Sequence, residues 1–382
     1  MSFTLFISAA EDSAHLYAEQ LLDYLLIKEP GLKTFGLGSV EMEKKGFCSV
    51  FPAKRFSIMG ITDIFKQYFF LKKAFAKLVK EIELQKPKVV LLIDYPGFNL
   101  RLAKACKKRN IPVVYFIPPK IWASRKNRIK DLKATCDKIL SIFEFEKPFY
   151  KHFKEKFVYV GNPLVNTIPK NYLDKDTNQA IRQKYGFSSN AKVVGLLPGS
   201  RKSEIQYILP TQIQVVEQLY KKDPKLEFSI FLAPSIEKES VQEYLKNTSA
   251  PVSIVKAPSA TVLRIPDFIL CASGTATLYA ALFLKPCVVM YKVHSLTMFI
   301  AQLILNKKLK FFSLPNLILN KPVFPEFIQK KMKTKEIVQY VENYLHSTAL
   351  QKQTKEDLKH LKEILKEKQP IEEVGNILLN YK

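Results

Sequence analysis

Short apolar runs alternate with longer segments of helical periodicity along the first half of the chain. The runs are rich in aliphatic and β-branched residues and read TLFISAA, TFGLG, VVLLID, PVVYFI, KILSIF and FVYVG. Amphipathic or basic segments separate them, and this alternation is typical of a parallel sheet whose strands are joined by helical crossovers. The pattern therefore predicts an α/β domain.

The same rhythm restarts after a polar stretch near residues 162–178. The later runs are KVVGLLPGS, EFSIFLAP, PVSIVKAP, FILCAS and PCVVMYKV. We therefore predict an α/β protein of two Rossmann-like domains with parallel sheets and a cleft between them, where a ligand site is expected. The predicted domains are residues 1–165 and 166–345, followed by C-terminal helices over 346–382 that could pack back on the first domain.

Composition and charge narrow the class of protein. With 382 residues and 47% hydrophobic content, the chain can bury a large core, which excludes global disorder. Lys and Arg outnumber Asp and Glu by 60 to 35, which gives a formal net charge of +25. Such a charge attracts phosphates, nucleic acids or anionic lipids, and it does not choose among them.

The cysteines and the apolar stretches argue against export and against a membrane span. The five cysteines form no CxxC pair, so we expect buried thiols in a reducing cytosol; they are Cys48, Cys106, Cys136, Cys271 and Cys287. The amino terminus lacks the basic region and cleavage site of a signal peptide. The uncharged stretch 268–284 contains CASGTAT, which favours a strand, a turn and a buried helix over a transmembrane helix.

In an open parallel sheet, ligands bind beyond the carboxyl ends of the strands, so candidate chemistry is expected in the residues that follow each run. In LLPGSR, Gly199 and Ser200 form a turn in which glycine allows close backbone approach to a ligand. Arg201 then offers a planar fork of donors that suits phosphate oxygens. The alternative is a surface arginine after an ordinary turn.

Two more strand ends carry candidate chemistry. Ser273, Gly274 and Thr275 open a helix, which aims backbone N–H groups at an anion, although any strand-to-helix turn does so to some degree. Asp94 ends the run VVLLID, where burial can raise its pKa towards that of a general base. The alternative for Asp94 is a cap of the following helix.

Several basic segments contain aromatic residues. PPKIWASRKNRIK places Trp122, the only tryptophan, near Arg125, a mixture that could face phosphates or lipid headgroups. No nucleic-acid motif accompanies it, so we expect no nucleic-acid partner. Residues 63–82 and 295–312 predict basic amphipathic helices, which either bind an anionic bilayer or pack on the core with a solvated lysine face.

The five histidines form no metal motif, and neither a Walker loop nor a nucleophilic serine elbow is present. We therefore expect no metal and no cofactor.

Taken together, a set of ordered segments resembles the lipid-A-disaccharide synthase family, glycosyltransferases of the two-Rossmann GT-B type. The resemblance covers nearly the whole chain, and the segments follow the family's order at about its spacing. They are SIMGITDIF, LLIDYPGFN, PPKIWASR, FEFEKPFY, VGNPL, LLPGSRKSEI, ASGTAT, SLPNLILN and PEFIQ. So many ordered matches are far more specific than any one of them.

The resemblance implies an inverting transfer of 2,3-diacylglucosamine from its UDP derivative to the 6-hydroxyl of 2,3-diacylglucosamine 1-phosphate. The products are the β-1,6-linked lipid A disaccharide 1-phosphate and UDP, and no metal takes part. It implies a role in making the lipopolysaccharide of a Gram-negative outer membrane. The enzyme would be cytoplasmic and peripheral, on the anionic inner face of the inner membrane, and the resemblance allows a homodimer.

The resemblance also implies roles for single residues. Asp94 and Arg201 match the essential aspartate and arginine. The UDP-sugar site would include Gly199, Ser200, Ser273, Gly274, Thr275, Asn316, Glu326 and Gln329. Candidates for the acceptor site and its loops are Glu11, Ser13, Asn99, Trp122 and Arg125.

The chain departs from the family pattern at several positions. The family's GEASGD loop reads AEDSAH at residues 10–15 and lacks both glycines, so close backbone approach is lost there. Gly97 replaces an aspartate, Asn162 replaces a histidine, and Tyr279 replaces a glutamate that could accept ribose hydroxyls. Two rivals follow: another membrane-associated GT-B UDP-sugar transferase, and a scaffold that binds lipid or nucleotide without turnover.

Overall fold

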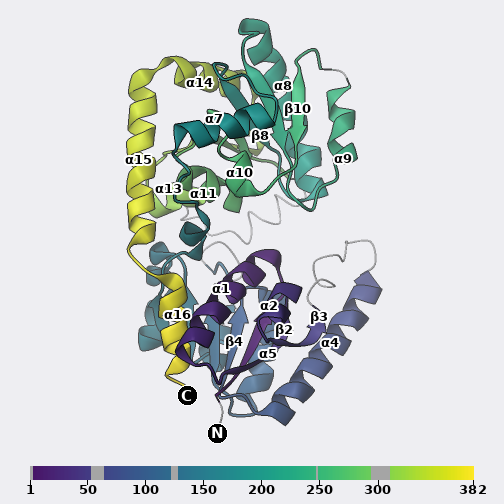
Figure 1. Cartoon of the computed structure of the whole chain (residues 1–382), viewed down its shortest axis with the longest axis vertical. Helices are drawn as coiled ribbons and strands as arrows, with labels where there is room; N and C mark the ends of the chain where they lie inside the picture. The colour runs from purple at the N-terminus through teal and green to yellow at the C-terminus, as the bar shows by residue number, and fades with distance from the viewer. Residues whose placement is uncertain (1–2, 53–63, 122–127, 247, 294–309) are drawn as a thin grey trace. The chain divides into compact units, whose positions relative to one another are not determined.

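The computed structural model in Figure 1 describes residues 3–52, 64–121, 128–246, 248–293 and 310–382. The chain divides into two compact units. The first comprises Met1–Pro163 together with Glu367–Lys382, and the second comprises Leu164–Lys366. The C-terminal helical segment is therefore shared between the units.

The first unit is built on a seven-stranded parallel sheet with the order β3-β2-β1-β4-β5-β6-β7. Its central strand β4 is wholly buried, which explains its unbroken apolar sequence VVLLI. The strands are β1 (Thr4–Ala9), β2 (Lys33–Gly38), β3 (Cys48–Pro52), β4 (Val89–Ile93), β5 (Val113–Phe116), β6 (Lys138–Ser141) and β7 (Phe157–Tyr159).

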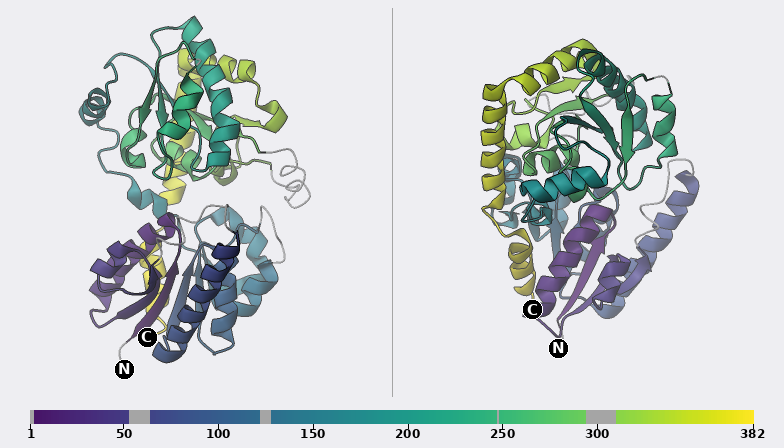
Figure 2. Two further views of the ribbon diagram at one scale, coloured as in Figure 1. Left: turned by 90° about the vertical axis from the view of Figure 1, so that its right-hand side faces the viewer. Right: turned by 45° about the horizontal axis from the view of Figure 1, so that its top comes forward.

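Helices cover both faces of this sheet (Figures 1 and 2). They are α1 (Asp12–Lys28), α2 (Val40–Lys44), α4 (Ile64–Gln85), α5 (Pro96–Lys107), α6 (Arg128–Thr135) and α16 (Pro370–Leu379), with a 3-10 segment over Glu144–Lys156. Proline at the first position of α5 has the backbone angle that a helix start needs. Helix α4 turns Ala74, Leu78 and Ile82 into the core, and its Leu71 and Phe75 pack against that core partly buried.

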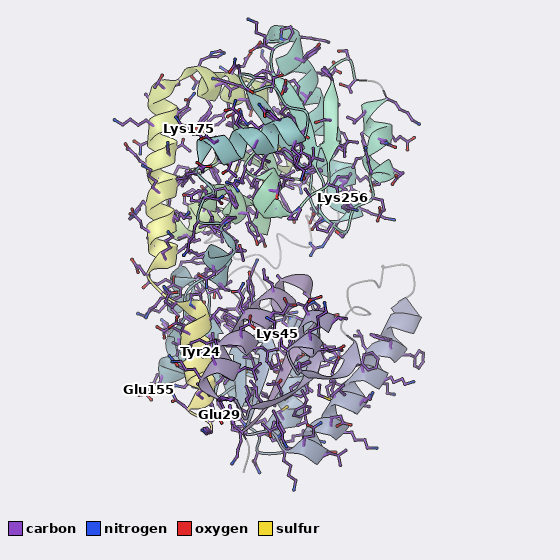
Figure 3. All side chains as sticks on the ribbon, in the orientation of Figure 1. Tyr24, Glu29, Lys45, Glu155, Lys175 and Lys256 are labelled. Atoms are coloured by element: carbon purple, nitrogen blue, oxygen red, sulfur yellow. The ribbon has the colours of Figure 1, made fainter. Side chains whose placement is uncertain are left out.

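The last helix, α16, packs on α1, and Figure 3 labels the α1 residue Tyr24 and, just beyond that helix, Glu29. The Tyr24 hydroxyl donates to Asn376 Oδ1 at 2.9 Å, and Lys382 forms an ion pair with Glu29. A Cβ on Gly375 would lie 2.5 Å from the Tyr24 ring. Glycine therefore allows the two helices to approach closely.

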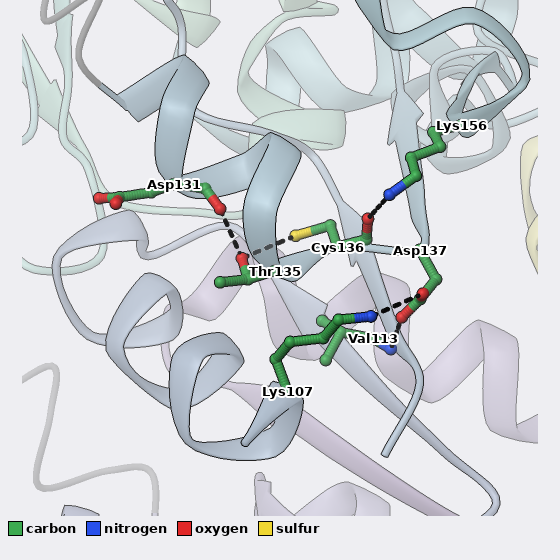
Figure 4. Close-up of polar contacts among 7 residues, drawn as sticks. All are labelled: Lys107, Val113, Asp131, Thr135, Cys136, Asp137 and Lys156. Atoms are coloured by element: carbon green, nitrogen blue, oxygen red, sulfur yellow. Dashed lines mark hydrogen bonds and ion pairs between the residues drawn. The ribbon is translucent and has the colours of Figure 1, made fainter. Parts of the chain in front are cut away.

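A cluster of polar contacts fixes the amino-terminal ends of β5 and β6 (Figure 4). Asp137 Oδ2 accepts from the backbone N–H of Val113 at 2.9 Å, and Lys107 lies 3.4 Å from Asp137 Oδ1. Lys156 donates to the Cys136 carbonyl at 3.1 Å. These contacts hold the strand starts, which leaves the opposite, carboxyl edge for ligands.

The second unit contains a six-stranded parallel sheet with the order β10-β9-β8-β11-β12-β13. Its strands are β8 (Val193–Leu197), β9 (Glu227–Phe231), β10 (Val252–Val255), β11 (Phe268–Ala272), β12 (Cys287–Tyr291) and β13 (Glu326–Ile328). Its helices are α7 (Lys175–Lys184), α8 (Lys202–Lys222), α9 (Glu239–Gln242), α10 (Ser259–Val262), α11 (Thr275–Leu282), α13 (Leu314–Leu319), α14 (Thr334–His346) and α15 (Thr348–Lys366).

The predicted fold class, two Rossmann-like domains with parallel sheets, is confirmed. The stretch 268–284 is the predicted strand, turn and buried helix, β11 and α11. The strands β3 and β13 are missing from the prediction because each is a short edge strand that carries or follows a proline. Most of the helix predicted over 295–312 lies outside the described residues.

Four of the five cysteines are buried as predicted, but Cys48 is exposed. It lies on the edge strand β3, which has a neighbouring strand on one side only. The prediction of a buried thiol was therefore wrong for Cys48. Among the helices that the structure describes, none is long and apolar enough to cross a membrane.

Candidate active site at the carboxyl edges of the two sheets

Each sheet reverses its strand order at one point. The reversal lies between β1 and β4 in the first unit and between β8 and β11 in the second. Loops that leave such neighbouring strands run to opposite faces of the sheet and open a crevice at its carboxyl edge. The predicted residues that follow β4, β8 and β11 lie at these two points.

Asp94 is the first residue after β4, and its backbone is left-handed with φ 49°. Tyr95, the N-cap of α5, is also left-handed, and no side chain caps that helix. Asp94 Oδ1 accepts a hydrogen bond from the Tyr95 backbone N–H at 2.8 Å. Within the described part of the chain, Oδ2 accepts none. The capping alternative is therefore not what the structure shows, and one carboxylate oxygen can serve a ligand.

Burial is the main cause that raises the pKa of the Asp94 carboxyl above its ordinary value of 3.8. The Tyr95 N–H and the positive charge of Lys120 lower that pKa, but they do not cancel the effect of burial. A carboxylate with a raised pKa is a stronger base. The electrostatics thus suit Asp94 to accept a proton.

Of the other first-unit candidates, Glu11 lies close enough to Tyr95 for its charge to act there. It is the N-cap of α1, and its charge, after burial, raises the pKa of the Tyr95 hydroxyl. Ser13 is exposed in the first turn of α1. Trp122 and Arg125 lie outside the described residues.

Asn99 is wholly buried. Its Oδ1 accepts from the Ser8 hydroxyl at 2.8 Å, and its Nδ2 donates to the carbonyls of Ile93 at 3.2 Å and Asp94 at 2.9 Å. A direct contact between Asn99 and an acceptor, as predicted from the sequence, would require the side chain to leave these partners. The structure instead places it behind Asp94.

In the second unit, Gly199, Ser200 and Arg201 form the turn between β8 and α8. Glu204 bends back from α8, so that its Oε2 accepts from the Ser200 N–H at 2.8 Å and its Oε1 lies 3.3 Å from Arg201 Nη1. A carboxylate thus occupies the turn where an anionic ligand is expected. The Arg201 side chain is 79% exposed, so its guanidinium can turn towards a ligand.

Gly199 has φ 118°, and a Cβ there would lie 2.4 Å from Glu204 Oε2. The close approach that requires glycine is therefore made by Glu204. Close approach of the backbone to a ligand at Gly199, which the sequence predicts, stays a prediction.

Ser273, Gly274 and Thr275 connect β11 to α11. The Ser273 N–H donates to the Met290 carbonyl at 2.9 Å, and a Cβ on Gly274 would meet no atom within 4 Å. Thr275 is exposed. No side chain of the described residues caps α8 or α11 at its N-cap residue, so the first N–H groups within both helices can bind an anion.

Asn316 and Glu326 bind each other. Asn316 is wholly buried, and its amide exchanges hydrogen bonds with the backbone of Phe324 and donates to Glu326 Oε1 at 3.0 Å. The Glu326 carboxylate also accepts from the backbone N–H groups of Phe312 and Ser313 and from the Ser313 hydroxyl. Both predicted site residues thus hold the turn before α13.

Gln329 follows the carboxyl end of β13 with a left-handed φ of 53°. Its buried Nε2 has no hydrogen-bond partner among the described residues. Left-handed backbone at a residue other than glycine and an unsatisfied buried donor are both costly, and both are typical of functional sites. Among the predicted site residues that the structure describes, Gln329 therefore has a buried side-chain N–H donor, Nε2, that is available to a ligand.

Four residues near these crevices were not identified from the sequence: Ser8, Tyr115, Glu204 and Tyr291. Glu204 could have been found, because charged residues three apart on a helix often pair. Burial raises the pKa of Tyr291, Glu204 raises it further and Arg201 lowers it, so this hydroxyl lies near the Arg201 turn. Ser8 and Tyr115 lie within apolar strands, where the sequence gives no sign of their partners.

Tyr279, which departs from the family pattern, lies on α11 with its hydroxyl 3.3 Å from Thr167 Oγ1. Its partner is thus a residue of the segment that precedes α7. Among the described residues, no group of three or more His, Cys, Asp or Glu side chains is placed to hold a metal ion.

The family model for lipid-A-disaccharide synthetase matches residues 5–376. The chain belongs to this family. The lipid-A-disaccharide synthase of Persephonella marina is 32% identical over 381 residues, which cover 98% of this chain and 97% of that protein. Lipid-A-disaccharide synthase 1 of Legionella pneumophila is 34% identical over 364 residues, 95% of this chain and 93% of that protein. The predicted family and enzyme class, a glycosyltransferase of lipid A biosynthesis, are confirmed.

Solved structures of other enzymes share the fold of this family member. UDP-GlcNAc 2-epimerase from Neisseria meningitidis matches with TM-score 0.59 at 14% identity, over 99% of this chain and 97% of that one. The calicheamicin glycosyltransferase CalG4 matches with TM-score 0.58 at 12% identity, over 100% and 98%. These likenesses support the two-Rossmann fold alone.

The Gly199 geometry predicts that Gly199→Ala lowers the free energy of unfolding by about 1–3 kcal/mol, because alanine is strained at this φ and its Cβ displaces Glu204. Gly31→Ala is the matched control, since a Cβ there meets only Glu29 Oε1 at 3.7 Å. Chemical denaturation of both variants measures the effect. Equal stability of the two variants would show that the position of Glu204 does not depend on a glycine at residue 199.

Proposed function

We propose that this chain joins UDP-2,3-diacylglucosamine to 2,3-diacylglucosamine 1-phosphate and forms the β-1,6 disaccharide 1-phosphate and UDP. The observation that carries the proposal is the division of chemistry between the two sheets. A base with a raised pKa follows β4, and two uncapped helix starts with an exposed arginine follow β8 and β11. Transfer of a sugar from a nucleotide needs a base for the acceptor hydroxyl and a binding site for the leaving diphosphate.

In the first unit, Asp94 acts as the general base. Its free Oδ2 takes the proton of the acceptor 6-hydroxyl as that oxygen forms a bond to C1 of the donor sugar. The bond between C1 and the diphosphate breaks on the opposite face, which inverts the configuration at C1. The released electron pair stays on UDP, so the step needs no redox partner.

In the second unit, the donor's diphosphate binds at the starts of α8 and α11. Arg201 leaves Glu204 for the phosphate oxygens, and the backbone N–H groups that follow Ser200 and those from Gly274 onwards add donors. These groups stabilise the charge that grows on the leaving UDP. The unused Nε2 of Gln329 donates to an acceptor of the same nucleotide, while Asn316 and Glu326 keep the neighbouring turn in place.

Substitution of the two proposed catalytic residues tests the proposal. Asp94→Asn should lower kcat by about 10²–10⁴-fold, because the amide cannot accept the proton. Arg201→Ala should lower it by about 10²–10³-fold, because the leaving charge loses a donor. UDP release in the presence of both acylated substrates measures kcat.

Matched controls are Asp131→Asn and Arg109→Ala, which make the same changes at surface ion pairs with Lys104 and Glu83. Both should retain wild-type kcat. Near-normal turnover by folded Asp94→Asn would remove Asp94 from the chemistry.

The raised pKa of Asp94 sets the pH dependence. The base works only when it is ionised, so kcat/KM should fall as pH drops through the Asp94 pKa. Because burial raises that pKa, the fall should lie at a higher pH than for an ordinary carboxyl of pKa 3.8. A pH profile with circular dichroism at each pH measures it. Activity that stays constant down to about pH 4 would contradict the raised pKa.

Both substrates carry acyl chains, so we propose that helix α4 binds the anionic inner face of the inner membrane. Its apolar stripe packs on the core, but Phe69 at its amino-terminal half is 66% exposed. Exposed lysines share the helix surface: Lys72, Lys73, Lys77 and Lys80. An exposed aromatic ring beside several cations suits an anionic bilayer surface. A homodimer, which the sequence allows, stays a prediction.

Phe69→Ser should therefore weaken binding to vesicles of phosphatidylglycerol by about tenfold, because a phenyl ring no longer leaves water. Binding of the wild type should also fall as salt rises, since screening weakens the lysine contribution. Ile27→Ser, which removes an apolar side chain that is 78% exposed on α1, is the control and should bind like the wild type. Vesicle sedimentation measures all three, and equal loss in both variants would argue against α4.

A further inference from the structure

The backbone at the end of β4 is held in an unfavourable conformation. Asp94 has φ 49°, and Tyr95 has φ 46° and ψ 56°, so two consecutive residues with side chains are left-handed. Each such residue costs about 1–3 kcal/mol and persists only where its surroundings determine it. Something in the structure must therefore hold this turn.

Two buried donors converge on the carbonyl oxygen of Asp94. The Tyr115 hydroxyl, on β5, donates to it at 2.7 Å, and Asn99 Nδ2, on α5, donates at 2.9 Å. Both side chains are wholly buried. The neighbouring strand and the following helix thus fix the same carbonyl from two directions.

The orientation of Asn99 is itself determined. The hydroxyl of Ser8, on β1, donates to Asn99 Oδ1 at 2.8 Å, so the amide must present Nδ2 to Ile93 and Asp94. Ser8 is also wholly buried. Residues from β1, β5 and α5 therefore form one polar network around the turn, and a satisfied buried network of this kind rigidifies its surroundings.

We infer that Tyr115 and Asn99, with Ser8 behind them, are positioning residues for Asp94. The inference rests on the proposed function, in which Asp94 is the base. The network holds the Asp94 carbonyl oxygen towards the core and so stabilises the left-handed turn. That turn holds the Asp94 carboxylate at the carboxyl edge of the sheet. Without it the turn can relax to ordinary backbone angles, and the carboxylate leaves the geometry that proton transfer needs.

Tyr115→Phe is the sharpest test, because it removes one oxygen atom and keeps the ring in the core. We expect kcat to fall by about tenfold or more, as the loss of one buried hydrogen bond allows, with the acceptor KM within about twofold of wild type. The acid limb of the pH profile should move to lower pH, since a relaxed carboxylate gains water and its pKa falls. Ser8→Ala should change both quantities in the same direction by a smaller amount.

Tyr150→Phe is the matched control. Tyr150 is also a buried tyrosine of the first unit whose hydroxyl donates to a backbone carbonyl, that of Pro119 at 3.1 Å. Its loss should leave kcat and the acid limb unchanged, although it should cost stability much as Tyr115→Phe does. A purely structural role for Tyr115 would make the two variants alike in every readout.

A readout without turnover separates this inference from the proposed function. Carboxyl carbon NMR of aspartate-labelled protein, with Asp94 assigned through Asp94→Asn, gives its pKa directly. Tyr115→Phe should lower that pKa towards 3.8, and Tyr150→Phe should not. An unchanged Asp94 pKa and wild-type kcat in Tyr115→Phe would overturn the positioning role while the proposed function stands. An inactive wild type with the expected NMR shift would overturn the function and keep the positioning role.

Discussion

The geometry of the proposed site depends on how the chain leaves a parallel strand. A parallel strand is followed by a crossover helix, and the connection is often only a few residues long. Such a sharp turn often needs a left-handed backbone. Such backbones follow β4 at Asp94 and Tyr95, β5 at Ile117 and β13 at Gln329, and Gly199 has positive φ after β8. These turns lie at the carboxyl edges of the sheets, where a reversed strand order opens a crevice. At Asp94 and Gln329, a left-handed backbone and candidate chemistry therefore occur together.

The two units use the same topology for opposite electrostatic tasks. In the first, burial raises the pKa of a carboxyl at the reversal point, which makes a base. In the second, uncapped helix starts and an exposed arginine form the proposed anion site, and Glu204 occupies part of it. Epimerases and glycosyltransferases share this fold, so the fold alone does not decide the reaction. The side chains at the strand ends decide it.

Much of the fold could be predicted from the sequence, because buried parallel strands are continuous apolar runs and the crossovers are amphipathic. The two edge strands could not, since β3 and β13 are short, β3 ends in a proline and β13 follows one. For the site, strand ends predicted the positions of Asp94, Arg201 and Gly274. The partners of these residues are contacts between distant segments: Ser8 reaches Asn99 across 91 positions, and no local pattern encodes that. The close neighbour of Gly199 is Glu204, a contact that the spacing of the LLPGSR segment did not predict.

The identity of the product tests the central claim most directly. Purified protein is incubated with UDP-2,3-diacylglucosamine and 2,3-diacylglucosamine 1-phosphate, and the mixture is analysed by mass spectrometry and by NMR of the anomeric proton. The account predicts a tetraacyl disaccharide 1-phosphate with a β-1,6 linkage, formed in equal amount to UDP. UDP without disaccharide, which would indicate hydrolysis, or a donor of unchanged mass and altered sugar configuration, which would indicate epimerisation, would contradict it.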